Sequence, residues 1–149
     1  METEEKAGVG WTGRHPDTKN QKAISSKWVY CIKCDAAGNP VHYKARLVAR
    51  GFSQVYGLDY DKTYAPVTCL ETIRLLLGIA TQKDWEIRQI DVKSTYLNGD
   101  LDEDIYMEVP PGYSFPKGCI LQLRKALYRL RQAGQQWYKT LQNKLRHLD

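Results

Sequence analysis

The chain has 149 residues, of which 42% are hydrophobic and 26% charged, a composition typical of a globular protein. Lys and Arg number 22 against 17 Asp and Glu, which gives a net charge of +5. We find no secretory leader and no apolar run long enough to cross a bilayer, so we expect an intracellular protein, cytoplasmic or nuclear, rather than a secreted or membrane protein.

The first half of the chain begins with a polar stretch and continues with a predicted hairpin. Residues 1–21 show no strand or helix period, and we expect them to form a leader that is either poorly ordered or foreign to the domain that follows. Two runs rich in β-branched and aromatic residues, Lys27 to Cys34 and Val41 to Arg50, flank the turn residues Asp35 to Pro40. This pattern predicts a β-hairpin, which a loop from Tyr56 to Pro66 then follows.

A helix is predicted next, because Thr68 and Glu71 have the spacing of a capping box. Its expected buried stripe consists of Leu70, Ile73, Leu76, Leu77 and Ala80. Trp85 to Val92 reads as a strand that carries Asp91 at its carboxyl end. Shorter strands are expected at Ile105 to Val109 and at Ile120 to Leu123. A last helix begins near Gln132 and has an apolar stripe of Trp137, Leu141, Leu145 and Leu148. The predicted fold class is α+β.

Four cysteines stand at positions 31, 34, 69 and 119. Cys31 and Cys34 have zinc-like spacing, but residues three apart on a strand point to opposite faces, and no second close pair exists. We therefore expect free thiols and no zinc site.

The charges are separated along the sequence. Eight basic side chains lie beyond Pro116, against one acidic residue, Asp149, whereas every charged residue from Asn98 to Glu108 is acidic. This separation favours a protein that handles polyanions and keeps one acidic corner. The alternative is two solvated faces of opposite sign.

Asp91 ends its predicted strand, Tyr96 follows five residues later, and an Asn98-Gly99 turn comes next. An aspartate in this position usually caps a turn. Here the run resembles the first catalytic motif of copia-type reverse transcriptases, the polymerases of one class of long-terminal-repeat retrotransposon. The resemblance extends over about residues 22–148, through the blocks at 27–30, 43–52, 64–67, 72–77, 105–113 and 126–138.

The resemblance implies the fingers and the first part of the palm of a right-hand polymerase over residues 22–149. In that family the aspartate of the motif, here Asp91, holds Mg²⁺, and the backbone carbonyl of Val92 is a second expected ligand. The family's second motif has two adjacent aspartates, and no such pair occurs in these 149 residues. We therefore expect a fragment of an RNA-directed DNA polymerase, truncated before that motif and inactive alone.

Further site residues follow from the same resemblance. Lys44 and Arg46, two apart on one strand face, are expected to grip the triphosphate of the incoming nucleotide, although a solvated face is the alternative. Tyr96 is expected under the sugar, where it would exclude a 2′-hydroxyl; alternatively it is a core tyrosine. Gln132 is expected as a polar contact near the nucleotide. The expected nucleic-acid contacts are Arg50, Lys125 and Arg131.

The expected partners are an RNA or DNA template-primer, deoxynucleoside triphosphates and the rest of a Pol polyprotein, with no membrane. Two departures from the family pattern indicate decay: Arg129 replaces a usual glycine and Gln135 a usual arginine. Two alternatives to a polymerase fragment therefore remain. One is a nucleic-acid-binding remnant with a basic surface, and the other is a degenerate product that does not fold well.

Overall fold

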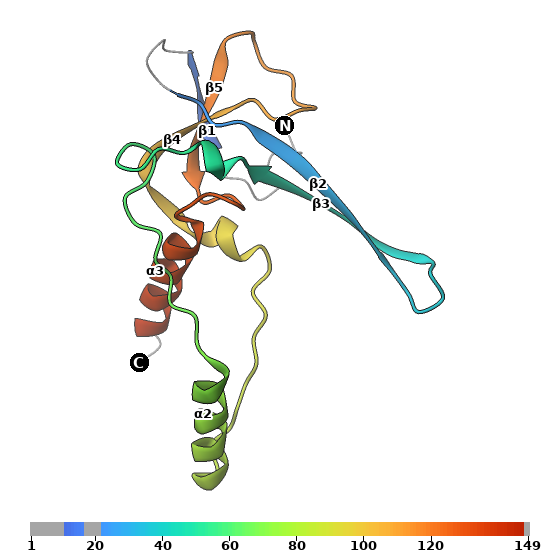
Figure 1. Ribbon diagram of the computed structural model, residues 1–149, viewed down its shortest axis with the longest axis vertical. Coiled ribbons are helices and arrows are strands. Elements are labelled where there is room, and N and C mark those ends of the chain that lie inside the picture. Colours follow the sequence, from blue (N-terminus) through green and yellow to red (C-terminus); the bar gives the residue numbers. More distant parts are fainter. Residues whose placement is uncertain (1–10, 17–21, 148–149) are drawn as a thin grey trace.

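The computed structural model describes residues 11–16 and 22–147, and its ribbon is drawn in Figure 1. One sheet has the central strand β5 (Cys119–Lys125) between β1 (Trp11–Pro16) and β4 (Asp100–Glu108), both antiparallel to it. The core is built on its apolar residues, among them Ile105, Met107 and Leu121, each at most 1% exposed. Helices and strands are thus mixed, as the predicted α+β class requires.

The strand β1 lies within the polar stretch in which the sequence shows no strand period. Its sequence, WTGRHP, has little strand character, so the extended conformation comes from pairing with β5, Trp11 opposite Leu123 and Pro16 opposite Cys119. Propensity does not report such a nonlocal partner. The other residues of the predicted leader lie outside the described ones.

The predicted hairpin is confirmed as β2 (Ser26–Cys34) paired with β3 (Pro40–Ala49), which projects from the body of the molecule in Figure 1. At its tip the Asp35 carboxylate accepts hydrogen bonds from the backbone N–H groups of Ala37 (2.9 Å) and Asn39 (2.8 Å). Hydrogen bonds from the backbone and side chain of Asn39 lower the pKa of Asp35. Gly38 closes the turn with φ +87°.

The two faces of this hairpin differ in character, because register partners of an antiparallel pair share a face. Ile32 lies opposite Tyr43 on an apolar face that also carries Trp28 and Tyr30. Ile32, Tyr43 and Tyr30 are 57 to 74% exposed. The other face carries the cations Lys27, Lys33, Lys44 and Arg46. The root of the hairpin is attached to the body, where Trp28 Nε1 donates to the carbonyl oxygen of Pro111 (2.9 Å).

The helix α2 (Leu70–Gln82) starts two residues after Thr68. The predicted capping box is not formed, because the N-cap is Cys69 and no side chain caps the helix. Instead the thiol of Cys69 lies 3.0 Å from Thr72 Oγ1, and this hydrogen bond lowers the pKa of Cys69.

The prediction of a buried stripe on α2 was wrong for four of its five residues. Only Ala80 is buried, whereas Leu70, Ile73, Leu76 and Leu77 are 43 to 55% exposed. Figure 1 shows the reason, since α2 stands away from both sheets at the end of two long connections. The helical period thus correctly indicated an apolar face of the helix, but within the described residues nothing packs against that face.

The predicted strand over Trp85 to Val92 is also wrong, because this segment is irregular. Ile90 is 83% exposed and Trp85 60%. A strand needs a neighbour for its backbone hydrogen bonds, and within the described residues this segment has none.

The later elements agree with the sequence in place but not in extent. Both β4 and β5 begin earlier than predicted, and α3 (Ala133–Arg146) has Gln132 as its N-cap. Trp137 and Leu141 on α3 are half-buried, whereas Leu145 is 55% exposed and Leu148 lies outside the described residues. Two 3-10 helices, η1 (Gly51–Ser53) and η2 (Thr95–Asn98), join these elements. In the part of the chain described, no helix has the length and apolarity to cross a membrane.

Candidate functional site

Asp91 lies exposed in the irregular segment that precedes η2. Among residues 11–16 and 22–147, no three His, Cys, Asp or Glu side chains group closely enough to hold a metal ion. The carbonyl oxygen of Val92 accepts a hydrogen bond from Thr95 Oγ1 (2.8 Å). Magnesium demands near-octahedral oxygen ligation, so one carboxylate and one carbonyl do not amount to a magnesium site.

The chain turns sharply after Val92 and thereby places Tyr96 against the body. Ser94 adopts the left-handed conformation, with φ 52° and ψ 41°. Asn98 Nδ2 donates to the carbonyl oxygens of Lys93 (3.3 Å) and Ser94 (3.2 Å), which closes the turn. Tyr96 is half-buried on η2 and packs against the hydrophobic core, so the alternative of a core tyrosine gains support.

Tyr128 joins two of the predicted nucleotide-binding residues. The rings of Tyr96 and Tyr128 meet edge to face, with centroids 5.1 Å apart and planes at 82°. Arg46 places its guanidinium carbon 5.9 Å from the centroid of the Tyr128 ring, within the range of a cation–π contact. Lys44 lies on the same face of β3 as Arg46. The contacts of Tyr128 with Arg46 on one side and Tyr96 on the other therefore connect the hairpin to the segment that carries Asp91.

The sequence did not single out Tyr128 as a site residue. The only indication in the sequence was that Tyr128 belongs to the block at 126–138, which resembles the family. The position of its backbone is set by a bridge to Val48, in which the Ala49 N–H donates to the Tyr128 carbonyl oxygen (2.9 Å).

Gln132 is fully buried, with 0% of its surface exposed. Its Oε1 accepts from Gln54 Nε2 (3.1 Å), and its Nε2 donates to the Asp59 carbonyl oxygen (2.8 Å) and to Glu103 Oε2 (3.4 Å). In this arrangement the side chain connects the loop at 54–59 to β4 and the start of α3. Gln54 and Asp59, both buried, were missed because only the tertiary fold brings them to Gln132.

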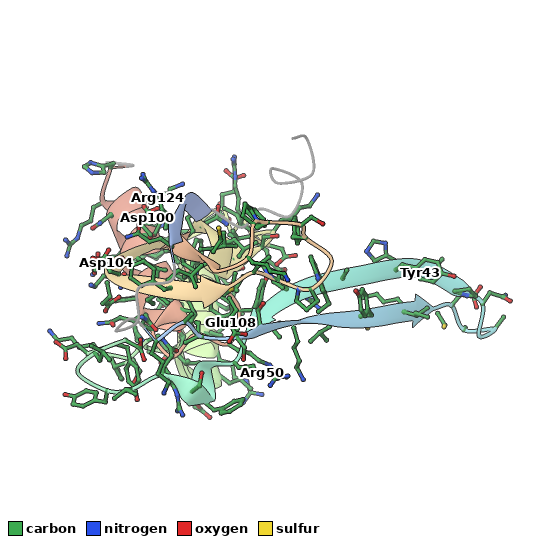
Figure 2. The ribbon with its side chains drawn as sticks, turned by 90° about the horizontal axis from the view of Figure 1, so that it is seen from above. Tyr43, Arg50, Asp100, Asp104, Glu108 and Arg124 are labelled. Atoms are coloured by element: carbon green, nitrogen blue, oxygen red, sulfur yellow. The ribbon has the colours of Figure 1, made fainter. Side chains whose placement is uncertain are left out.

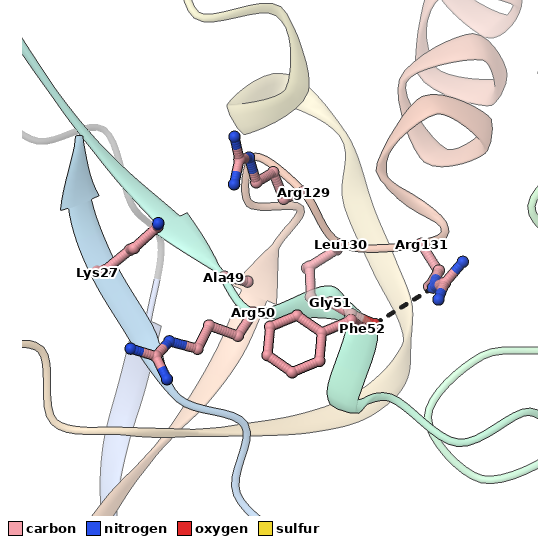
Figure 3. Close-up of a pocket in the computed structure, with 8 residues that line it drawn as sticks. All are labelled: Lys27, Ala49, Arg50, Gly51, Phe52, Arg129, Leu130 and Arg131. Atoms are coloured by element: carbon pink, nitrogen blue, oxygen red, sulfur yellow. Dashed lines mark hydrogen bonds between the residues drawn. The ribbon is translucent and has the colours of Figure 1, made fainter. Parts of the chain in front are cut away.

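Arg50 and Arg131 line one pocket of about 540 Å³, drawn in Figure 3. The lining residues are Lys27, Ala49, Arg50, Gly51, Phe52, Arg129, Leu130 and Arg131. Arg131 Nε donates to the Gly51 carbonyl oxygen (3.3 Å), the dashed line in Figure 3. The third predicted nucleic-acid contact, Lys125, is elsewhere: its Nζ pairs with Asp100 Oδ1 (3.2 Å), and Figure 2 shows Asp100 and Arg50 in separate parts of the molecule.

The acidic corner predicted from charge is tied to α3. Lys139 Nζ lies 2.6 Å from Asp102 Oδ2, and Gln136 Nε2 donates to the same oxygen (3.2 Å). The hydrogen bond from Lys139 lowers the pKa of Asp102, the bond from Gln136 acts in the same direction, and partial burial opposes both. This carboxylate is therefore engaged within the fold and is not a free metal ligand.

Known proteins resemble this chain over most of its length. It is 43% identical over 80% of its residues to the retrovirus-related Pol polyprotein from transposon TNT 1-94 of Nicotiana tabacum. Over 97% of its residues it is 39% identical to the corresponding polyprotein from transposon RE1 of Arabidopsis thaliana, and 37% identical to that from transposon RE2. The chain spans only about a tenth of the length of these relatives. No solved structure matches it.

A family model described as reverse transcriptase (RNA-dependent DNA polymerase) matches residues 15–149. This match and the three polyproteins confirm the resemblance drawn from the blocks around Asp91. The chain therefore belongs to the reverse transcriptase (RNA-dependent DNA polymerase) family.

Proposed function

We propose that this chain supplies the fingers and the first part of the palm to a longer Pol polyprotein that copies RNA into DNA inside the cell. The observation that carries the proposal is the chain of two side-chain contacts from Arg46 to Tyr128 and from Tyr128 to Tyr96. It couples a cationic strand face to the turn that follows Asp91, as a site for a nucleoside triphosphate requires. Phosphate needs cations and the sugar needs a shaped wall close by.

In this proposal Lys44 and Arg46 bind the triphosphate, and Tyr96 lies under the sugar. The edge-to-face contact with Tyr128 and the packing against the core fix the Tyr96 ring. A ring held in this way cannot move aside for a 2′-hydroxyl, so it favours deoxynucleotides over ribonucleotides.

Asp91 and the Val92 carbonyl would hold part of a magnesium site that another segment of the polyprotein completes with further carboxylates. The ion, when bound, neutralises charge on the reacting phosphates. Because the described residues supply too few ligands, we expect no polymerase activity from the 149 residues alone.

A chimera tests this function. Residues 22–147 replace the corresponding segment of the RE1 polyprotein, which is 39% identical to this chain, and extension of a primed RNA template by deoxynucleotides is measured. We expect extension, and we expect Asp91→Asn to reduce its rate on the order of 10²- to 10³-fold, the usual loss when a group that stabilises developing charge is removed. Asp61→Asn, which removes an exposed loop carboxylate, is the control. An Asp91→Asn chimera as active as its parent would contradict the proposal.

A second candidate function is nucleic-acid binding without catalysis, and the pocket in Figure 3 favours it because four of its lining residues are cations. It predicts a chimera that binds nucleic acid with steep salt dependence and does not extend primers. A third possibility, a degenerate product that folds poorly, predicts no cooperative thermal transition for the 149-residue chain.

A further inference from the structure

The chain between Asp91 and Tyr96 turns at one strained residue. Ser94 has φ 52° and ψ 41°, a left-handed conformation that only glycine adopts without a steric cost. Strain of this kind persists only where the surrounding structure holds it in place. Other groups of the chain must therefore hold this turn.

Asn98 holds the turn from the far end of η2. Its Nδ2 donates to the carbonyl oxygens of Lys93 (3.3 Å) and Ser94 (3.2 Å), which belong to the peptide groups on either side of the strained residue. The Ser94 carbonyl also accepts the Leu97 N–H (2.9 Å), the backbone bond that begins η2. One half-buried side chain thus fixes the orientation of both peptide groups that define the turn.

The residue after Asn98 is fixed on the body of the molecule. The carbonyl oxygen of the buried Gly99 accepts the Ala126 N–H (2.8 Å). A Cβ on Gly99 would lie 2.9 Å from the backbone nitrogen of Trp137, so glycine alone lets the chain pass this close to α3. Asn98 therefore connects an anchored point of the chain to the exposed segment that carries Asp91.

A nucleotide bound as in the proposed function would span this turn. Its phosphates lie toward Asp91 and its sugar lies on the ring of Tyr96, which packs against the core and against Tyr128. A shift of Asp91 relative to that ring would move the sugar against its wall. Misplacement by about 1 Å can change a rate roughly 10²-fold, so the geometry of the turn matters for selectivity.

We propose that Asn98 is a positioning residue, which sets the place of Asp91 relative to the Tyr96 ring and thereby determines how strictly the site excludes a 2′-hydroxyl. The inference rests on the proposed function. It goes beyond that function by naming a side chain that touches no substrate and still controls sugar selectivity through two hydrogen bonds to the backbone.

Extension of a primed RNA template by the RE1 chimera tests the proposal, with kcat/KM measured for a deoxynucleotide and for the ribonucleotide of the same base. Asn98→Leu keeps the volume of the side chain and removes its donors. We expect it to lower the ratio of the two values roughly 2- to 12-fold, the factor that corresponds to loss of about one hydrogen bond. Asn98→Ala should lower the ratio equally. Asn143→Ala, which removes an exposed asparagine on α3, is the matched control and should leave the ratio unchanged.

Two results of this assay would overturn the proposal. If Asn98→Leu lowered both values of kcat/KM alike and left their ratio at that of the parent, the role of Asn98 would be merely structural. If Asn98→Ala lowered the ratio and Asn98→Leu did not, packing by the side chain would carry the effect in place of its donors.

Amide hydrogen exchange in the 149-residue chain gives a second readout, which needs no polymerase activity. The Leu97 N–H donates to the carbonyl that Asn98 holds, so its exchange should be roughly 2- to 12-fold faster in Asn98→Leu and unchanged in Asn143→Ala. Unchanged exchange in Asn98→Leu would overturn the positioning role. A parent chimera that extends no primer would contradict the proposed function, and the exchange result would then decide the positioning role by itself.

Discussion

Gly51 and Arg129 meet backbone to backbone: a Cβ built on Gly51 would lie 1.9 Å from the carbonyl oxygen of Arg129. The two residues are far apart in sequence, and their contact joins η1 to the loop that precedes α3. Glycine is required here for space, because no side chain could move aside to admit the extra atom.

Gly51→Ala should therefore destabilise the protein by at least about 1–3 kcal/mol, the usual cost of overpacking. The free energy of unfolding from urea titration followed by circular dichroism measures this change. The control is Gly78→Ala, in the middle of α2 with nothing within 4 Å of the added Cβ, which should gain about 0.5–1 kcal/mol. Equal stability of both variants would show that the close approach is not maintained in solution.

Gln132→Leu should cost about 1–3 kcal/mol, because it leaves the buried amide of Gln54 and the Asp59 carbonyl without their partner. The same urea titration measures it. Gln82→Leu, at the exposed end of α2, should have little effect. A Gln132→Leu variant as stable as the parent would contradict the role of this side chain as a structural connection and would favour its predicted role as a nucleotide contact.

The Tyr96–Tyr128 contact should appear as a coupling energy of about 0.5–1.5 kcal/mol in a double-mutant cycle of Tyr96→Leu and Tyr128→Leu, the range for an edge-to-face aromatic pair. Thermal unfolding of the four chains gives the value. Tyr96→Leu combined with Tyr56→Leu, at a 71% exposed ring, should show additivity. Additivity in both cycles would mean that Tyr128 does not hold the Tyr96 ring.

Asp102 should make stability depend on acidic pH. Its pKa is lowered from the ordinary value of 3.8, chiefly by the hydrogen bond from Lys139. The folded state therefore gains stability when this group is ionised, fully above about pH 3.8, and loses it as pH falls through the lowered folded value. The melting temperature of the Asp102→Asn variant should fall less between neutral and acidic pH than that of the parent. If the melting temperatures of variant and parent fell equally on acidification, solvent would screen the pair with Lys139 too strongly for it to stabilise the fold.

The sequence predicted the elements whose causes are local. The hairpin follows from turn residues at Asp35–Pro40. Helix α3 follows from the helical period of an apolar stripe whose members Trp137 and Leu141 are half-buried. The predictions of a strand over Trp85 to Val92 and of a buried stripe on α2 were both wrong. A strand needs a paired strand and a buried stripe needs a packed surface, and the described residues provide neither. Pairing of β1 with β5 could not be predicted either, since its partner lies about a hundred residues away.

The same distinction applies to the site. Strand alternation correctly placed Lys44 and Arg46 on one face. The roles of Asp91 and Tyr96 came from the family resemblance and stay predictions. Sequence gave no measure of burial at Gln132, nor any sign that Tyr128 would link Arg46 to Tyr96. These depend on contacts between residues about thirty to eighty positions apart, which no local pattern encodes.

The hairpin is attached to the body near its root, at the Trp28 contact with Pro111. A small rotation there moves each residue in proportion to its distance from the root, and strand residues are spaced about 3.3 Å apart along that arm. Lys33, beside the tip, therefore sweeps a wider arc than Arg46, which is close to the root. Tyr43, whose distant position is visible in Figure 2, shares this larger displacement. A rotation at the root would therefore displace Lys33 and Tyr43 more than Arg46, which lies over the Tyr128 ring.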